Sequence, residues 1–313
     1  MSVPTSTFET YAAVGIRDDL TDEIYNVDPT DTPLLTAFGK VKATQPLHEW
    51  QTDAFAAASS SNAVAEGDDA TNDAVTATVR LSNTCQISDK VIQISGTQEV
   101  SVKAGRKSEM GYQIAKAAKE LKRDMEAIIT RNGAEVTGSS GTARQLGAIL
   151  SWLETNTSFG TGGADGTVGN TARTDGTQRV FTEDMLTAAL QDVWSNGGDP
   201  DIISVGAFNK RKMSAFSGNA TRYVDAMEQE LNAAIDIYVS DWGRHKIVPD
   251  RFQRSRDALI LQTDMWALAY LRTFNIADLA KTGDSNRKQM LVEYTLESRN
   301  EKASGGVFDL TVS

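Results

Sequence analysis

Three pairs of neighbouring carboxylates are the side chains of this sequence best suited to catalysis or cation binding. Two aspartates placed side by side, or one residue apart, can hold a divalent cation or divide the roles of general acid and general base. The pairs are Asp18–Asp19, Asp68–Asp69 and Asp199 with Asp201. The last pair flanks Pro200 between an expected helix and an expected strand, where aspartate commonly bonds to the backbone of a turn. A metal-assisted hydrolase that uses paired aspartates is therefore one hypothesis, and a structural turn is the alternative for the third pair.

Histidine and cysteine give weaker signals. The two histidines, His48 and His245, and the single Cys85 do not have the spacing of a zinc site. His48 precedes Glu49, but Thr52 stands where the motif H-E-x-x-H needs its second histidine. We interpret His48 as a strand residue with a local hydrogen bond and Cys85 as a small buried residue in a chain without disulfides.

A basic cluster could contact phosphate or the carboxylates of a partner. Phe252 is its only interleaved aromatic residue, which favours a solvated or interface surface over nucleic-acid binding. The cluster comprises Arg244, His245, Lys246, Arg251, Arg254 and Arg256. The sequence has no G-x-x-x-x-G-K-[ST] phosphate loop and no G-x-S-x-G nucleophile elbow. We assign no catalytic, cofactor-binding or metal-binding residue, and the sequence predicts a protein that is not an enzyme.

The elements that position these residues begin with a long helix. Apolar residues recur at spacings of three and four between Gly105 and Asn132, which predicts one amphipathic helix with Gly133 as its C-terminal stop. The stripe consists of Met110, Ile114, Ala117, Ala118, Leu121, Met125, Ile128 and Ile129. At about 1.5 Å per residue, this helix would be a rod of about 40 Å, long for a globular domain.

An arm and a long hairpin are expected before this helix. In residues 1–40 we predict a short helix over Asp18–Val27, a turn cluster over Asp28–Pro33 and a second helix over Leu34–Phe38, stopped by Gly39. Residues 45–95 read as strands His48–Thr52 and Val75–Leu81 around a loose Ser/Ala-rich tip. A hairpin of this kind is unstable alone and needs a partner surface.

A mixed α/β region follows the helix. Residues 155–176 hold six of the 24 glycines and are expected to form a flexible surface loop. Thr182 is placed to cap a helix that runs to Trp194. The further elements are a helix over Phe208–Phe216, strands over Asp201–Val205, Ile235–Ser240, Lys246–Val248 and Ala258–Gln262, and a closing hairpin over residues 288–313 in which Met290, Val292, Tyr294 and Leu296 share one face.

Charge is distributed unevenly along the chain. The net charge is −11, and residues 1–75 carry thirteen acidic and three basic residues, a balance of −10. Residues 103–131 carry eight basic and four acidic residues, a balance of +4. Two solvated faces explain this pattern, and so does an acidic arm that lies on the basic helix of a neighbouring subunit. An acidic chain is not expected to be a dedicated nucleic-acid binder, and no stretch approaches the roughly 20 apolar residues of a membrane span.

Several segments together resemble the major capsid proteins of tailed bacteriophages with the Hong Kong 97-like fold. They follow one another along almost the whole chain in the order that this fold requires. The segments are Asp19–Leu35, His48–Asp53, Ile94–Gln98, Glu120–Glu126, Leu279–Asp284 and Val292–Leu296.

The resemblance implies an α+β capsid fold with five parts. They are an N-arm (1–45), an extended loop or hairpin (46–100), a peripheral domain (101–177) with a spine helix at 105–132, an axial domain (178–262) and return strands to the peripheral domain (263–313). It also implies a virion shell protein, assembled in the host cytoplasm, that partners with itself in pentamers and hexamers. The icosahedral shell would enclose double-stranded DNA without sequence-specific binding, beside scaffolding, portal and decoration proteins and without a membrane. An encapsulin-like nanocompartment shell is the alternative.

Two departures from the family qualify these expectations. Some relatives carry a long N-terminal scaffolding segment, whereas here the arm begins at once, so a separate scaffolding protein or none is expected. In the type member, a loop lysine forms an isopeptide bond with a neighbour's asparagine. Residues 43–89 of this sequence contain no lysine, so we expect no crosslink of that kind.

Overall fold

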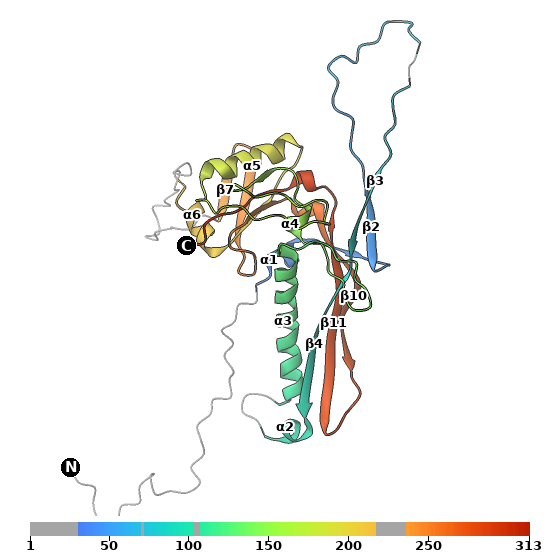
Figure 1. Cartoon of the computed structure of the whole chain (residues 1–313), viewed down its shortest axis with the longest axis vertical. Helices are drawn as coiled ribbons and strands as arrows, with labels where there is room; N and C mark the ends of the chain where they lie inside the picture. The colour runs from blue at the N-terminus through green and yellow to red at the C-terminus, as the bar shows by residue number, and fades with distance from the viewer. Residues whose placement is uncertain (1–30, 70–71, 103–106, 217–235) are drawn as a thin grey trace, which may run out of the picture.

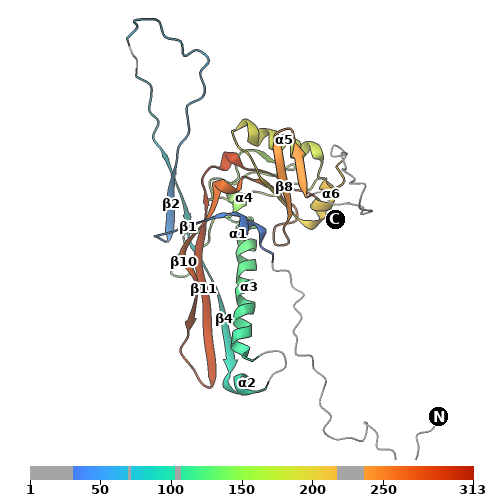
Figure 2. The same cartoon turned by 180° about the vertical axis from the view of Figure 1, so that it is seen from behind.

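The computed structural model describes residues 31–69, 72–102, 107–216 and 236–313. A long helix, α3 (Glu109–Thr130), lies along one face of a four-stranded sheet, and a second body lies beyond its C-terminal end (Figure 1). A two-stranded hairpin projects well beyond both (Figure 2). The predicted helix Asp18–Val27 and the first half of the turn cluster Asp28–Pro33 lie outside the described residues.

The four-stranded sheet supports the long helix. Its order is β1 (Gly39–Lys42), β10 (Trp266–Asp278), β11 (Ser285–Ser298) and β4 (Gln86–Ser95). β1 runs parallel to β10, and the other pairs are antiparallel. Alternate residues of β11 are buried towards α3, as its sequence pattern predicts. These residues are Met290, Val292, Tyr294 and Leu296.

The predicted long helix is confirmed, with shorter bounds. Ser108 caps it, since its Oγ accepts a hydrogen bond from the N–H of Gly111 at 3.1 Å. Its stripe packs into the main core through buried Leu121, Met125 and Ile129. Gly133 as the stop is wrong, because the chain already becomes extended at Arg131 (φ −69°, ψ 164°). The 22 helical residues make a rod of about 33 Å.

The second body is built on a six-stranded sheet. Its order is β5 (Thr157–Ser158), β12 (Gly305–Val307), β9 (Ala258–Leu261), β6 (Ile202–Val205), β8 (Gly243–Pro249) and β7 (Ile237–Ser240). Helices α5 (Glu183–Ser195) and α6 (Ala207–Met213) belong to the same body. Thr182 is the residue before α5, but its side chain makes no capping hydrogen bond. Three of the four predicted strands lie within two residues of those observed, and β8 begins three residues before the predicted start at Lys246.

Two hydrophobic cores meet at strand β9. Leu259 and Leu261 point into the core of α3 and the four-stranded sheet, whereas Ala258 and Ile260 point into the core under α5. The period-2 alternation of a strand therefore lets one four-residue element serve both cores. The short helix α4 (Ile149–Trp152) is fully buried in the first core.

The predicted closing hairpin over residues 288–313 is wrong. β11 pairs with β10 and β4, while Gly305–Val307 joins the six-stranded sheet beside β9. The sequence analysis did not predict β10. Its register with β11 shifts around Arg272, and this shift breaks the alternation of apolar and polar residues. Short 3-10 turns precede β10 and follow β11, at Thr263–Met265 and Glu301–Ala303.

The glycine-rich segment is packed against the protein, so the expectation of a surface loop is wrong for part of it. Gly160, Gly166 and Gly169 are buried. Gly169 has a φ of +78°, and a Cβ atom there would lie 2.7 Å from the ring of Trp152. Only glycine satisfies both the backbone conformation and the close approach.

Two short helices complete the fold. α1 (Pro33–Ala37) begins at Pro33, one residue before the predicted start at Leu34, and buries Leu34 and Leu35. Gly39 does not stop it through a left-handed cap, since Gly39 already lies in β1. The second helix, α2 (Gly96–Val100), follows β4 directly and was not anticipated from the sequence. No helix among the described residues is long and apolar enough to cross a membrane.

Candidate assembly surfaces

The root of the projecting hairpin is firmly attached to the four-stranded sheet. Its strands are β2 (Leu47–Thr52) and β3 (Val79–Thr84), so the second strand begins four residues later than predicted. Trp50 Nε1 donates to the carbonyl of Ser298 at 2.8 Å. Asn83 Nδ2 donates to the carbonyls of Gly147 and Leu296 at 3.1 and 2.7 Å. Because these groups are buried or half-buried, the hairpin leaves the sheet in a fixed direction.

The loop between these strands spans residues 53–78, and its described residues (53–69 and 72–78) do not pack against the described part of the chain. All of its described residues are exposed, and Phe55 and Val75 are 105% and 96% exposed. The loop holds five acidic residues and no basic one: Asp53, Glu66, Asp68, Asp69 and Asp73. An exposed aromatic ring on an acidic, unsupported loop is expected to become buried when the loop meets a basic partner surface.

A hollow of about 870 Å³ opens on the face of the four-stranded sheet that points away from α3. β1, β10 and β11 form it, and its walls include apolar Leu271, Phe274 and Leu291. Lys40 and Lys42 stand at its β1 side, and neither has an ion-pair partner among the described residues. The hollow therefore combines apolar walls with exposed positive charge.

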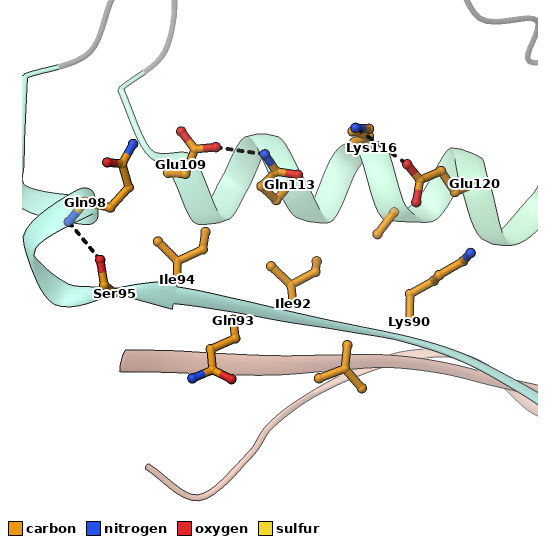
Figure 3. Close-up of a pocket in the computed structure, with 12 residues that line it drawn as sticks. Lys90, Ile92, Gln93, Ile94, Ser95, Gln98, Glu109, Gln113, Lys116 and Glu120 are labelled. Carbon is orange, nitrogen blue, oxygen red and sulfur yellow. Dashed lines mark hydrogen bonds and ion pairs between the residues drawn. The ribbon is translucent and has the colours of Figure 1, made fainter. Parts of the chain in front are cut away.

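A second groove of about 640 Å³ lies between α3 and β4. Figure 3 shows Ile92 and Ile94 pointing from β4 towards the helix. The charges of the groove balance within it, because Lys116 lies 3.8 Å from Glu120 and Lys90 lies 2.7 Å from Asp124. The positive balance of residues 103–131 therefore does not lie at this groove.

The three carboxylate pairs do not form a catalytic site in the described part of the chain. Asp18–Asp19 lies outside it, and Asp68–Asp69 is exposed in the hairpin loop. Asp201 instead accepts hydrogen bonds from the backbone N–H and the hydroxyl of Thr263, at 2.7 and 2.6 Å. Asp201 therefore bonds to the backbone as predicted, but to a segment 62 residues away rather than within its own turn. Across the described residues, no group of three or more His, Cys, Asp or Glu side chains could hold a metal ion.

The interpretation of Cys85 is also confirmed, and His48 lies in β2 as predicted, but the hydrogen bond of His48 is not local in the sequence. His48 Nε2 lies 2.9 Å from Glu297 Oε2, and this hydrogen bond lowers the pKa of the Glu297 carboxyl. Cys85 is fully buried, and burial raises the pKa of its thiol to about 11. Both residues stabilise the junction of the hairpin with the sheet.

The predicted basic cluster is not one surface. His245 is buried, with Nδ1 2.6 Å from the carbonyl oxygen of Pro200. Arg254 and Arg256 turn inward, where Arg256 Nη2 contacts Asp309 Oδ1 at 2.7 Å. Only Arg244, Lys246 and Arg251 are exposed.

Arg254 and Arg256 belong to a buried charge network that the sequence does not reveal. Arg173 lies at its centre, 3.6 Å from Asp309 Oδ2 and with its guanidinium 3.7 Å from the centroid of the Phe308 ring. Burial raises the pKa of Asp257 to about 6, against the opposing charges of Arg254 and Arg173. The network joins the glycine-rich segment to the end of the chain, and these partners are too distant in sequence for any local pattern to relate them.

Comparison with known proteins settles the kind of protein that bears these surfaces. A family model described as SU10 major capsid protein matches residues 3–311. The chain belongs to this capsid protein family. It is also similar to a protein described as "Major capsid protein" from Escherichia phage Phieco32, with 28% identity over an alignment of 346 residues that covers 98% of each chain.

Solved structures show the same fold. The protein of the Cyanophage A-1(L) capsid asymmetric unit is 14% identical, with a TM-score of 0.66 over 97% of this chain and 98% of that chain. A structure from Gordonia phage Cozz is 10% identical, with a TM-score of 0.63 over 99% and 98%. The expected α+β capsid fold is thus confirmed, and the protein is a phage major capsid protein. These comparisons favour neither the nanocompartment nor the hydrolase alternative.

Proposed function

We propose that copies of this capsid protein form pentamers and hexamers that close an icosahedral shell around packaged double-stranded DNA. The observation that carries the proposal is the hairpin loop 53–78, whose described residues are all exposed and include bare Phe55 and Val75. A two-stranded hairpin is at best marginally stable alone. A neighbouring subunit supplies the missing surface, so that ordering of the loop and assembly are coupled.

The domain assignment is part of this proposal. The four-stranded sheet with α3 is the peripheral domain, and the six-stranded sheet with α5 is the axial domain around the five-fold and six-fold axes. Residues up to about 45 form the N-arm. We narrow the extended loop to residues 47–84, because Gln86–Ser95 pairs with β11. The return strands after residue 262 serve both domains, since β12 pairs with β9.

The hollow beside β1 is the place that suits the loop of a neighbour. The loop carries five acidic and no basic residues, and Lys40 and Lys42 line the hollow without ion-pair partners among the described residues. Phe55 would bury its ring against Leu271 and Phe274. Apolar burial supplies most of the affinity, at about 25 cal/mol per Å², and the charges select the register.

The remaining partners follow from a role in the virion. Assembly in the host cytoplasm, with scaffolding, portal and decoration proteins, belongs to the proposed role. The net charge of −11 supports enclosure of DNA without sequence-specific binding, because an acidic wall repels phosphate.

Deletion of the loop tip tests this function. We expect a variant in which a short Gly-Ser turn replaces residues 54–74 to fold and to form no regular shells in negative-stain electron microscopy. Circular dichroism should retain the helix signal, because α3 and α5 do not contact the tip. Regular particles at the yield of the unmodified chain would refute the role of the loop in assembly.

A length-matched variant separates the chemistry of the loop from its reach. Replacing residues 54–74 by a Gly-Ser linker of the same length keeps the span but removes Phe55 and most of the acidic residues. We expect this variant also to fail in assembly. Normal shells from it would show that only the span of the loop matters.

A further inference from the structure

Two buried carboxyl groups meet where α1, α3 and the segment after β8 come together. Glu126 on α3 is 0% exposed, and Asp250 is 2% exposed. Glu126 Oε1 accepts a hydrogen bond from the N–H of Leu34 at 2.8 Å, and Oε2 accepts one from the N–H of Leu35 at 2.9 Å. These two N–H groups start α1, so the carboxyl of Glu126 ties α1 to the long helix.

Asp250 faces Glu126 from the other body. Its Oδ1 accepts a hydrogen bond from the N–H of Phe252 at 2.8 Å. Its Oδ2 is buried and has no donor among the described residues. The segment packs on α3 beside Glu126, since Thr130 Oγ1 contacts the carbonyl oxygens of both Glu126 and Phe252, at 2.8 and 3.5 Å. Two carboxylates cannot bond to one another, so a proton on one of them is the group that satisfies Oδ2 and completes the contact.

We propose that Glu126 and Asp250 share one proton, and that loss of this proton loosens the attachment of α1 to α3. With the proton present, one carboxyl donates to the other while Glu126 still accepts from Leu34 and Leu35. Without it, two buried negative charges face each other. Separation of the segments that carry them, through local opening of α1, is the response that lets water reach both charges.

The described charged groups nearest the pair lie on α3 and in the segment after Asp250. α1 carries no ionisable side chain, and Asp31 before it is exposed. On α3, Arg123 lies one turn earlier, and its guanidinium is 5.4 Å from the centroid of the Phe252 ring. After Asp250, Arg251 is exposed and Arg254 pairs with Asp175 and Asp257.

The direction of the pH effect follows from burial. Burial, together with the charge of Asp250, raises the pKa of Glu126 to about 7, above its ordinary value of 4.5, although the N–H groups of Leu35 and Leu34 oppose the shift. Burial also raises the pKa of Asp250. A raised pKa in the closed state means that the closed state binds more protons than the open one. The attachment is therefore complete below about pH 4.5, weakens as the pH rises and is weakest above about pH 7.

Hydrogen–deuterium exchange of the assembled full-length protein tests the proposal between pH 5 and pH 8. The readout is the protection factor of peptides that cover residues 33–38, which corrects for the pH dependence of intrinsic exchange. We expect protection to fall roughly 50-fold over this range in the unmodified chain, which is the linkage for one proton. Amides in the middle of α3 should keep their protection.

Asp250→Asn mimics the protonated pair, because its amide nitrogen donates in place of the shared proton while Oδ1 still accepts from the N–H of Phe252. In Glu126→Gln, one of the two oxygens that accept from Leu34 and Leu35 becomes a nitrogen that cannot accept, so this variant starts from lower protection. In both variants, protection of residues 33–38 should not change with pH. Glu120→Gln, the same substitution at a more exposed position of the same helix, should keep the slope of the unmodified chain.

Three results would overturn the proposal. The first is protection of residues 33–38 that does not change with pH in the unmodified chain. The second is an unchanged slope in both amide variants. The third result needs only the unmodified chain, so it can be obtained even if neither variant folds. If protection falls equally with pH for residues 33–38 and for the middle of α3, the effect is one of global stability.

Discussion

Arg173 shows how single residues hold the interior of this capsid protein together. Its side chain is almost fully buried and lies between the Phe308 ring and Asp309. A buried charge of this kind is tolerated only because opposite charges surround it. Asp257 and Asp309 are both fully buried, and each pairs with arginine: Asp257 with Arg254, and Asp309 with Arg173 and Arg256.

Removal of Arg173 should therefore be strongly destabilising. We expect Arg173→Met to lower the free energy of unfolding of the unassembled subunit by about 3–5 kcal/mol, because it leaves buried carboxylates with too few partners. Urea denaturation measures this loss. Arg251→Met, at an exposed position, is the matched control and should change stability by less than about 0.5 kcal/mol. Equal effects of the two substitutions would contradict a structural role for the buried network.

Local patterns predict residues whose environment is local. The strand position of His48 and the burial of Cys85 follow from the local pattern and from residue type. Glu126 and Arg173 could not be predicted in this way, because their partners, Leu34 and Asp309, come from distant parts of the chain. On the sequence alone, Glu126 is one more charge on an amphipathic helix.

Elements with a strong period were predicted well, and elements whose ends depend on packing were not. The eight-residue apolar stripe fixed the long helix, whereas its end at Arg131 rather than Gly133 depends on where the chain turns to pack beneath α4. The start of β3 was predicted four residues too early. The apolar alternation already begins at Val75, whereas pairing with β2 begins only at Val79, opposite Thr52. Strand β10 was not predicted, because its register with β11 shifts around Arg272 and its apolar residues do not alternate regularly.

The charges of the hairpin loop and of β1 make a prediction about assembly at the scale of elements. Lys40→Glu combined with Lys42→Glu should slow assembly, followed by light scattering, by roughly two- to tenfold at low salt, since each surface pair contributes about 0–1 kcal/mol. High salt should reduce the difference, because the Debye length falls to about 3 Å at 1 M. Adding Asp68→Lys and Asp69→Lys should restore the rate by reversing the partner charges.

Net charge needs its own control in this experiment. Arg244→Glu with Lys246→Glu changes the net charge by the same amount at exposed residues of the axial body, and should have a smaller effect that the loop reversal does not rescue. A variant in which Lys116, Lys119 and Lys122 of α3 are replaced by Glu tests the alternative that the loop docks on the long helix. If the loop reversal rescues this variant and not the β1 variant, the long helix is the docking surface.

At the scale of the whole molecule, the two sheet-containing bodies share strand β9, and the β2–β3 hairpin projects away from both. β9 contributes to both cores, so the two sheets are held together by apolar packing within the chain. The hairpin is fixed at its root and exposed over its length, which suits an element that is completed only by a neighbour. Such a shell gains its stability from many weak contacts that form together.

The absence of lysine from the hairpin leads to the last prediction, on how finished particles come apart. Residues 43–89 contain no lysine, and the nearest ones, Lys40, Lys42 and Lys90, lie in or next to strands of the four-stranded sheet rather than in the loop. An isopeptide bond between a loop lysine and a neighbour's asparagine is thus impossible at the position that the hairpin offers. We expect shells boiled in denaturant to run as a single band of 33.8 kDa on a gel. The variant Ser60→Lys places a lysine in the loop. A ladder of covalent oligomers from this variant alone would show that the loop lies near a reactive side chain of a neighbour in the shell. A ladder of covalent oligomers from the unmodified protein would mean that a lysine of the sheet forms the bond, and the argument from the loop would fail.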